Sequence, residues 1–337
     1  DESNGTCGKR LEGIGVKNTE SNRRKYRTML ATTPGLGEYI SGVILYEETL
    51  YQKASIYGVK AADERLIIDH FRDQGIIPGI KVDTGLRPLI DTLPHAKPGE
   101  HYCSGLDGLL ERAQEYYKQG ARFAKWRAVL QITEDGPSDF AIKENAWGLA
   151  RYARAVQEAG LVPIVEPEIL MDGDHHIEKT AAVQERVIKE VYAACATAGV
   201  LLEGTLLKPS MTVCGAECPD QADYKKVAGY TIRTLLRSVP AAVPGINFLS
   251  GGLSEEAASI YLNEMNAAPD LPWNVSFSYG RALQHSAIRA WGGSDIEAGQ
   301  KFIIARAKAN SEASMGVYEA DSQPSSDEKL FVAGYSY

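Results

Sequence analysis

The chain has 337 residues, of which 44% are hydrophobic and 24% charged, so it can bury a large core. Its net charge of −8 argues against a general binder of nucleic acid or anionic membranes, because such surfaces need an excess of Lys and Arg. No apolar run approaches the roughly 18 to 20 residues of a membrane span, and none has the layout of a signal peptide, so we expect a soluble protein. The five scattered cysteines fit a reducing compartment better than a disulfide scaffold.

Seven short apolar segments are predicted to be β-strands. Four of them follow a helical pattern and a glycine, and these glycines are separated by 45, 40 and 39 residues. Such a spacing accommodates one helix, one strand and two loops, so it indicates a repeated βα unit with a parallel sheet and right-handed crossovers. In chain order the strands are expected within residues 39–48, 73–82, 118–127, 158–167, 197–209, 244–252 and 273–281, and the glycines are Gly75, Gly120, Gly160 and Gly199.

The segments before these glycines have helical periodicity. Leu149, Tyr152, Ala153 and Val156 recur at the spacing of one helix face, and Gly160 follows as the residue that ends the helix in a left-handed conformation. Repeated βα units can build either a doubly wound open sheet or a (β/α)₈ barrel. Seven strands are one fewer than a barrel requires.

Charged and small polar residues at the strand ends decide between these architectures. An open sheet would spread such residues along an edge, whereas a barrel gathers the C-terminal ends of all its strands around one mouth, where the active site lies. We therefore predict an α/β protein with a (β/α)₈ TIM barrel. The residues at the strand ends are Glu47, Lys81, Lys125, Arg127, Glu166, Glu168, Lys208, Ser250 and Arg281.

Lys208 lies at the end of an apolar run. An amine attacks a carbonyl only when it is unprotonated, and burial against Leu206 and Leu207 with Lys125 nearby should lower the pKa of this lysine. The sequence thus indicates a lysine that forms a Schiff base, with Glu166 exchanging the protons. The structural alternatives are a lysine that extends its head to solvent and ion pairs that merely fill the barrel.

A turn of Ser250, Gly251 and Gly252 precedes a predicted helix. Backbone N–H groups in such a turn can bind a phosphate, and Arg281, one strand later, could complete the site. Ser-Gly-Gly is also common in ordinary loops, which is the alternative for this turn taken alone.

Several motifs resemble those of the class I fructose-bisphosphate aldolases. They occur in the family's order over essentially the whole chain, and they are GIKVDTG, GARFAKWR, VPIVEPEIL, LLKPSM, FLSGG and FSYGRALQ, with the opening DESNGTCGKR and the closing YSY. The resemblance implies a barrel that reversibly cleaves fructose 1,6-bisphosphate to dihydroxyacetone phosphate and glyceraldehyde 3-phosphate without a metal or other cofactor. It also implies a homotetramer.

The resemblance further implies roles for individual residues. Lys208 would form the Schiff base, Glu166 would be the general acid and base, and Glu168 would support the lysine. Lys125 and Asp1 would act on the hydroxyls at the scissile bond. One phosphate would bind Ser250, Gly251, Gly252 and Arg281, and the other would bind near Ser3, Thr6, Lys81 and Arg127, with Lys9 and Arg10 close by.

Residues 319–329 are polar, so on sequence alone the tail behind them would be a frayed end. The resemblance instead implies that Tyr337 moves the proton at the enamine carbon. We therefore expect a single catalytic barrel over residues 1–318 and a flexible tail over residues 319–337 that reaches the active site. Members of the family carry an apolar strand before the motif that opens this chain, so the first barrel strand is expected to be missing from the N-terminus of the sequence.

Other functions remain open at this point. The same lysine could serve another Schiff-base barrel or sedoheptulose bisphosphate, and the barrel could be a scaffold for protein partners that has lost catalysis. The ending FVAGYSY resembles plastid forms, which predicts the chloroplast stroma rather than the cytoplasm, and service in the Calvin cycle besides glycolysis and gluconeogenesis. The adjacent His175 and His176 do not share a helix face, so we predict no metal site there.

Overall fold

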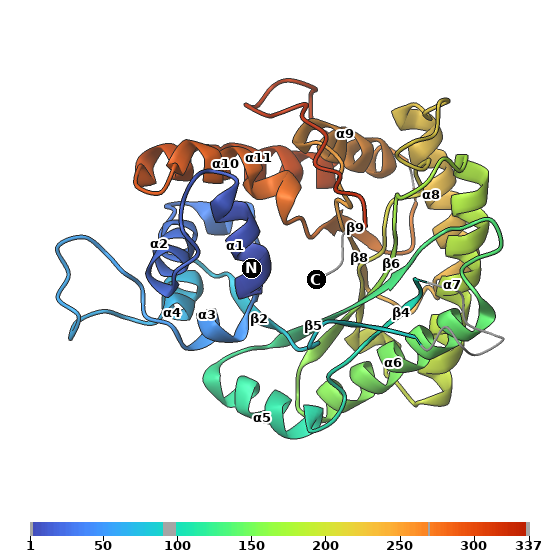
Figure 1. The fold of residues 1–337 in the computed structure, drawn as a ribbon, viewed down its shortest axis with the longest axis horizontal. Coiled ribbons are helices and arrows are strands. Elements are labelled where there is room, and N and C mark those ends of the chain that lie inside the picture. The colour runs from blue at the N-terminus through green and yellow to red at the C-terminus, as the bar shows by residue number, and fades with distance from the viewer. Residues whose placement is uncertain (1–2, 90–98, 269, 335–337) are drawn as a thin grey trace.

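The structure, a computed structural model, describes residues 3–89, 99–268 and 270–334. Within these residues, a seven-stranded parallel sheet curls around a common interior, with helices on the outside (Figure 1). All seven predicted strands are present, and each pairs with the next along the chain. In order across the sheet they are β1 (Gly42–Leu45), β2 (Ile77–Lys81), β5 (Phe123–Leu130), β6 (Val162–Ile169), β7 (Leu206–Leu207), β8 (Gly245–Phe248) and β9 (Asn274–Phe277).

Helices connect the strands, as the repeated βα unit predicts. A small antiparallel hairpin of β3 (Leu86–Pro88) and β4 (His101–Cys103) follows β2 and was not predicted. No helix of the described residues combines the length and apolarity needed to cross a membrane. The α-helices of this part of the chain are α1 (Asn4–Glu12), α2 (Glu20–Ala31), α3 (Glu47–Tyr51), α4 (Ile67–Asp73), α5 (Leu109–Gln119), α6 (Asp139–Glu158), α7 (Ile177–Thr197), α8 (Tyr224–Ser238), α9 (Glu255–Asn266), α10 (Arg281–Trp291) and α11 (Ile296–Ser314).

The helix α6 illustrates how the sequence fixes the ends of these helices. Its N-cap residue is Ser138, whose Oγ accepts a hydrogen bond from the backbone N–H of Ala141 at 3.1 Å. At the other end Gly160 has a φ of 86°, and the N–H of Leu161 donates to the carbonyl of Val156 at 2.9 Å. The four residues of the predicted apolar face are all buried, so the periodicity is confirmed.

Packing of α6 orients the side chains of the sheet. Trp126 of β5 stacks on Tyr152 with ring centroids 5.5 Å apart, and the Tyr152 hydroxyl donates to the carbonyl of Ile164 in β6 at 3.1 Å. Burying an aromatic side chain of this size contributes on the order of 2 to 3 kcal/mol. Successive residues of a strand point to opposite faces, so Trp126 on the outer face turns Lys125 and Arg127 toward the interior.

The strands β1 and β9 are the first and last of the sheet, and in the described ranges neither outer edge pairs with another strand. Residues of both strands line the central cavity. The predicted α/β barrel architecture is thus confirmed as a curled parallel sheet in which seven strands are described.

The chain beyond α11 packs along α9 rather than extending into solvent. The Tyr318 hydroxyl contacts the Glu256 carboxylate at 2.8 and 2.9 Å, and the N–H of Ser326 donates to Glu255 at 3.0 Å. Both glutamates are buried in the first turn of the helix. Residues 318–326 are therefore anchored by specific bonds, although they form no helix or strand.

Candidate active site

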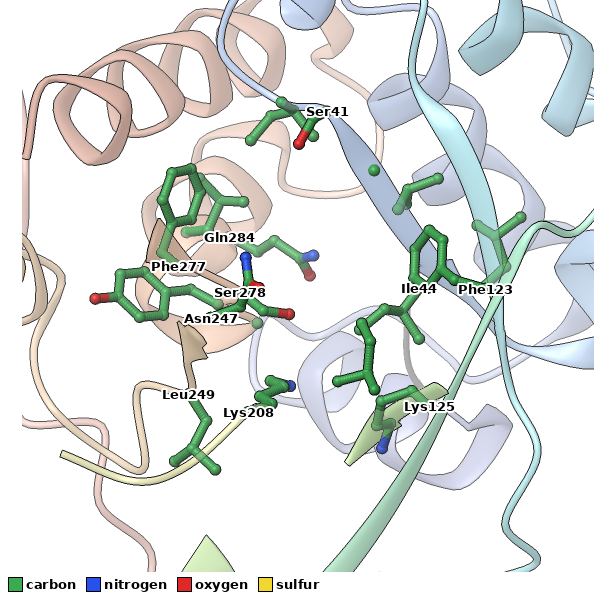
Figure 2. Close-up of a pocket in the computed structure, with 18 of the residues that line it drawn as sticks. Ser41, Ile44, Phe123, Lys125, Lys208, Asn247, Leu249, Phe277, Ser278 and Gln284 are labelled. Atoms are coloured by element: carbon green, nitrogen blue, oxygen red, sulfur yellow. The ribbon is translucent and has the colours of Figure 1, made fainter. Parts of the chain in front are cut away.

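A cavity of about 700 Å³ occupies the interior of the curled sheet. Lys125 and Lys208 lie toward one end of it in Figure 2, and apolar side chains such as Ile44, Phe123 and Phe277 surround much of the remainder. Most of the predicted site residues line this cavity, so the structure brings them together as expected. They are Ser3, Arg10, Lys81, Lys125, Arg127, Glu166, Glu168, Lys208, Ser250, Gly251 and Arg281.

The other predicted residues are not among those that line the cavity in the described part of the chain. Thr6 is buried inside α1, Lys9 is exposed on the same helix, and Gly252 is not among the residues that line the cavity. Asp1 and Tyr337 lie outside the described residues, so their roles remain predictions. A further strand-end residue, Glu47, begins helix α3 and is exposed, because the chain turns outward directly after β1.

Parallel strand pairing places the charged side chains at two neighbouring levels of the sheet. Lys81 is opposite Lys125 in the β2–β5 register, and Arg127 is opposite Glu166 in the β5–β6 register. The N–H of Lys208 donates to the carbonyl of Val165 at 2.8 Å, which aligns this lysine with Glu166. Side chains from four consecutive strands therefore meet in one row.

Glu166 lies between two lysines at the centre of this row. Its Oε1 is 3.1 Å from Lys208 Nζ and its Oε2 is 3.1 Å from Lys125 Nζ. The side chains are nearly inaccessible, with 12% of Lys208, 6% of Lys125 and 4% of Glu166 exposed. Lys208 and Glu166, which the sequence predicts to act together, are therefore in direct contact.

Asp83 extends the row beyond the predicted residues. Its Oδ1 accepts a hydrogen bond from Lys81 Nζ, and its Oδ2 lies 3.7 Å from Lys125 Nζ. Sequence reasoning missed this residue because it lies two positions after the predicted strand end at Lys81. The usable signal was the i, i+2 spacing within IKVD, which puts both side chains on one face where the extended conformation continues.

The environment of Lys208 lowers its pKa from the ordinary value. Burial has the largest effect and lowers the pKa of Lys208; Glu166 opposes this effect, and the Lys125 ammonium adds to it. The net shift is downward from the ordinary value, as the sequence predicts. A larger fraction of this amine is therefore able to act as a nucleophile near neutral pH.

Glu166 is held in its charged, ionised form. Burial alone would raise its pKa, but Lys125, Lys208 and Arg127 together outweigh burial and lower the pKa of Glu166 to about 2. The carboxylate is thus ionised across the physiological range. It can accept a proton when the neighbouring amine becomes positively charged.

Glu168 contacts Arg127 directly rather than Lys208. The Arg127 Nε donates to Glu168 Oε2, and both side chains are buried. The charge of Glu168 still favours the protonated form of Lys208. The role of Glu168 in supporting Lys208 stays a prediction, and its hydrogen bond orients the guanidinium of Arg127.

The Ser250–Gly252 turn has the predicted form. Gly251 and Gly252 have φ values of 57° and 103°, in the region that favours glycine, and the N–H of Leu253 donates to the carbonyl of Ser250 at 2.9 Å. Ser254 then caps α9 by accepting from the N–H of Ala257 at 3.1 Å. A glycine turn followed by a capped helix start provides backbone N–H groups and a favourable dipole for an anion.

The C-terminal tail lies against this turn. The N–H of Leu330 donates to the carbonyl of Gly252 at 3.0 Å, and the Arg281 guanidinium donates to the carbonyl of Leu330. Arg281 begins α10 directly after β9. The main chain of the tail thus contacts two of the predicted phosphate-binding residues.

The N-terminal helix α1 approaches the cavity from another side. Ser3 is its N-cap residue, with Oγ accepting from the N–H of Thr6 at 3.3 Å, and Arg10 in its last turn lines the cavity. Lys81 and Arg127 line the same cavity from β2 and β5. In the residues with described positions, no group of three or more His, Cys, Asp or Glu side chains is arranged to hold a metal ion.

Inside the curled parallel sheet, a buried amine contacts a buried carboxylate. This arrangement is typical of barrel enzymes that form an imine with a carbonyl substrate. The whole chain, residues 1–337, matches the family model described as fructose-bisphosphate aldolase class-I. The chain therefore belongs to the class I fructose-bisphosphate aldolases.

Proteins with similar sequences are named as aldolases of the same kind. The chloroplastic aldolase 3 of Arabidopsis thaliana is 55% identical over all of this chain and 83% of its own length, and the chloroplastic aldolase 1 of Pisum sativum is 54% identical over all of this chain and 92% of its own. A solved structure of the Plasmodium falciparum aldolase, in complex with TRAP and a small-molecule inhibitor, superposes with a TM-score of 0.89 at 49% identity, covering 95% of this chain and 90% of that one.

The chain is thus a lyase that cleaves fructose 1,6-bisphosphate reversibly through a lysine Schiff base. Its similarity to the chloroplastic forms, at 52% to 55% identity, supports the plastid stroma as its compartment. A cytosolic form from Arabidopsis thaliana is 52% identical. The compartment was predicted from the C-terminal sequence, and the similarity to plastid forms agrees with that prediction.

Proposed function

We propose that Lys208 is the lysine that forms the Schiff base and that Glu166 exchanges the protons of imine formation. The observation that carries this proposal is the 3.1 Å contact between Lys208 Nζ and Glu166 Oε1 inside the sheet. Lys208 combines a lowered pKa with this buried carboxylate partner. Both conditions are needed for an amine to attack a ketone at neutral pH.

Imine formation follows from these two side chains. The neutral Lys208 amine attacks the ketone carbon of the substrate, the nitrogen becomes positively charged, and the carbonyl oxygen, released from its double bond, takes up a proton from solvent to become a hydroxyl group. Glu166 accepts a proton from that nitrogen and returns it to the hydroxyl, which leaves as water. The resulting protonated imine withdraws electrons from the adjacent carbon atoms.

Carbon–carbon cleavage uses the imine as the electron acceptor. Removal of the proton from the hydroxyl at the scissile bond lets that bond break, and its electron pair moves into the imine to give an enamine and a free aldehyde. We assign the handling of that hydroxyl to Lys125, which contacts Glu166 at 3.1 Å, together with Asp1. The enamine carbon is then protonated with the help of Tyr337, and water releases the ketone from Lys208.

The two phosphates would bind at opposite sides of the cavity. One is assigned to Ser250, the glycine turn and Arg281, where backbone N–H groups and a guanidinium meet an anion. This binding mode requires Leu330 to release its hydrogen bond with Arg281. The other phosphate is assigned to the side lined by Ser3, Arg10, Lys81 and Arg127, with Thr6 and Lys9 nearby on helix α1.

The same chemistry explains why the enzyme should need no metal ion. Metal-dependent aldolases polarise the substrate carbonyl with a bound cation, whereas the protonated imine supplies that positive charge here. Sedoheptulose bisphosphate has the same reacting carbons, and we include it as a second substrate. We further propose that each chain forms one barrel over residues 1–318 and that its tail, residues 319–337, reaches the active site. Four such chains would form a homotetramer.

Steady-state kinetics of Lys208→Met test the assignment of the lysine. Turnover should fall to the background rate while circular dichroism and the melting temperature stay close to those of the unmodified protein, since Met retains the length and apolar stem of the side chain. Lys118→Met is the matched control, because Lys118 is 69% exposed on α5 and should be dispensable. Substantial turnover in Lys208→Met would exclude this lysine as the nucleophile.

A further inference from the structure

Asp83 is a buried carboxylate that none of the proposed steps uses. Its side chain is 2% exposed and lies just beyond the end of β2. Oδ1 accepts a hydrogen bond from Lys81 Nζ, whose other bond goes to the Asp83 carbonyl at 2.9 Å. Oδ2 accepts no hydrogen bond from any described residue and lies 3.7 Å from Lys125 Nζ.

Five charged groups alternate in sign along the row that contains this residue. The row runs from Lys81 through Asp83, Lys125 and Glu166 to Lys208. Two further titratable groups lie near the Asp83 carboxylate, namely the Cys103 thiol from β4 and the Tyr152 hydroxyl from α6. Burial raises the pKa of both, so they stay neutral and leave the charge of Asp83 to act on the lysines.

Lys125 contacts two carboxylates of the row, whereas Lys81 and Lys208 contact one each. Lys125 lies between two, with Glu166 at 3.1 Å and Asp83 at 3.7 Å. Lys208 contacts Glu166 alone among these carboxylates, and it lies on the far side of Glu166 from Asp83. Because opposite charges stabilise an ammonium, the second carboxylate favours the protonated form of Lys125 over that of Lys208.

We propose that Asp83 is a positioning residue for the aldolase reaction: its carboxylate holds the Lys125 ammonium beside Glu166 and keeps it protonated, so that Lys208 is the amine left free to attack the substrate. The inference rests on the proposed roles of Lys208, Glu166 and Lys125. Asp83 itself need not touch the substrate. Its effect on the reaction passes through the position and charge of Lys125.

Two substitutions of Asp83 separate charge from shape. Asp83→Asn removes the charge at nearly constant volume, and Asp83→Glu keeps the charge. In Asp83→Asn, Lys125 should lose its proton more readily, so the alkaline limb of the kcat profile should move about one to three pH units lower. The KM for fructose 1,6-bisphosphate should change less than kcat. Asp83→Glu should return the limb toward its original position, and the control Asp73→Asn, at a 57% exposed carboxylate, should leave it unchanged.

A merely structural role predicts a different result. In that case Asp83→Asn would lower kcat by the same factor at every pH, and this outcome would overturn the inference. If Asp83→Asn does not fold, Asp83→Ser replaces it, and failure of both to fold would also assign Asp83 to structure alone. Borohydride trapping of dihydroxyacetone phosphate separates failure of this inference from failure of the proposed function. If Lys208 is still trapped but the alkaline limb of the kcat profile does not move in Asp83→Asn, only the role of Asp83 is refuted. If the trapped peptide of the unmodified protein does not carry the adduct on Lys208, the proposed function is refuted.

Discussion

Replacement of Glu166 by Gln is the perturbation with the largest expected effect for the smallest change in shape. Glu166 lies 3.1 Å from both Lys125 Nζ and Lys208 Nζ, and it is almost fully buried. At 3.1 Å and an effective dielectric constant near 20, each interaction is worth about 5 kcal/mol before the cost of desolvation. Gln keeps the volume but can neither accept a proton from the Lys208 nitrogen nor balance the two ammonium charges.

The catalytic consequence follows from the lost proton exchange. General acid–base groups contribute about 10²- to 10⁴-fold to rate, so kcat of Glu166→Gln should fall by that factor while KM changes little. The assay is initial-rate cleavage of fructose 1,6-bisphosphate, with the aldehyde product coupled to a dehydrogenase. Rapid-quench borohydride trapping should show that imine formation itself has become slow.

The matched control is Glu158→Gln, at a carboxylate that is 60% exposed and paired with Arg154 on α6. Its kcat should stay within about two-fold of the unmodified enzyme, because exposed ion pairs of this kind contribute little. A kcat of Glu166→Gln within about three-fold of the unmodified value would refute the reasoning. It would show that another group exchanges the protons at Lys208.

Three further outcomes follow from the structure. The folded-state pKa of Glu166, about 2, lies below its ordinary value of 4.5, so its ionisation stabilises the fold by about 3 kcal/mol above pH 4.5, and this contribution is lost as the pH falls toward 2. The free energy of unfolding, measured with urea between pH 5 and pH 3, should therefore fall more steeply for the unmodified protein than for Glu166→Gln, and parallel curves would contradict this. Chelators should leave kcat unchanged, and a loss restored by added divalent cation would count against the imine mechanism. Gly252→Ala should destabilise by about 1 to 2 kcal/mol and loosen the tail, because Gly252 has a φ of 103° and an added Cβ would lie 2.8 Å from the Phe331 Cα; unchanged stability together with unchanged protease sensitivity of the tail would contradict that contact.

Much of the fold could be predicted because local chemistry determines it. Apolar runs bounded by glycine identify the strands, and Gly160 shows why: its positive φ ends one helix and directs the chain into the next strand. The short pairing of β7, Leu206–Leu207, still occupies its predicted place, because Lys208 and Pro209 follow an apolar run with no competing helical pattern. The β3–β4 hairpin was missed because each of its strands spans only three residues.

The site was predictable to the extent that side chains lie on regular strands. Lys125, Glu166 and Lys208 follow from the alternation of faces in a parallel sheet, which sets direction before any contact is known. Asp83 was missed because it lies past the strand end at Lys81, and its i, i+2 spacing from Lys81 indicates a shared face only if the extended backbone continues there. The contact between Arg281 and Leu330 was likewise inaccessible, since it joins residues 49 apart through a segment without regular structure.

The central claim is that Lys208, rather than a neighbouring lysine of the same row, bonds covalently to the substrate. Borohydride reduction in the presence of dihydroxyacetone phosphate, followed by proteolysis and mass spectrometry, tests it directly. The modified peptide should contain LLKPSM with the added mass on Lys208. Modification of Lys81 or Lys125 in its place, or no stable adduct at all, would contradict the account.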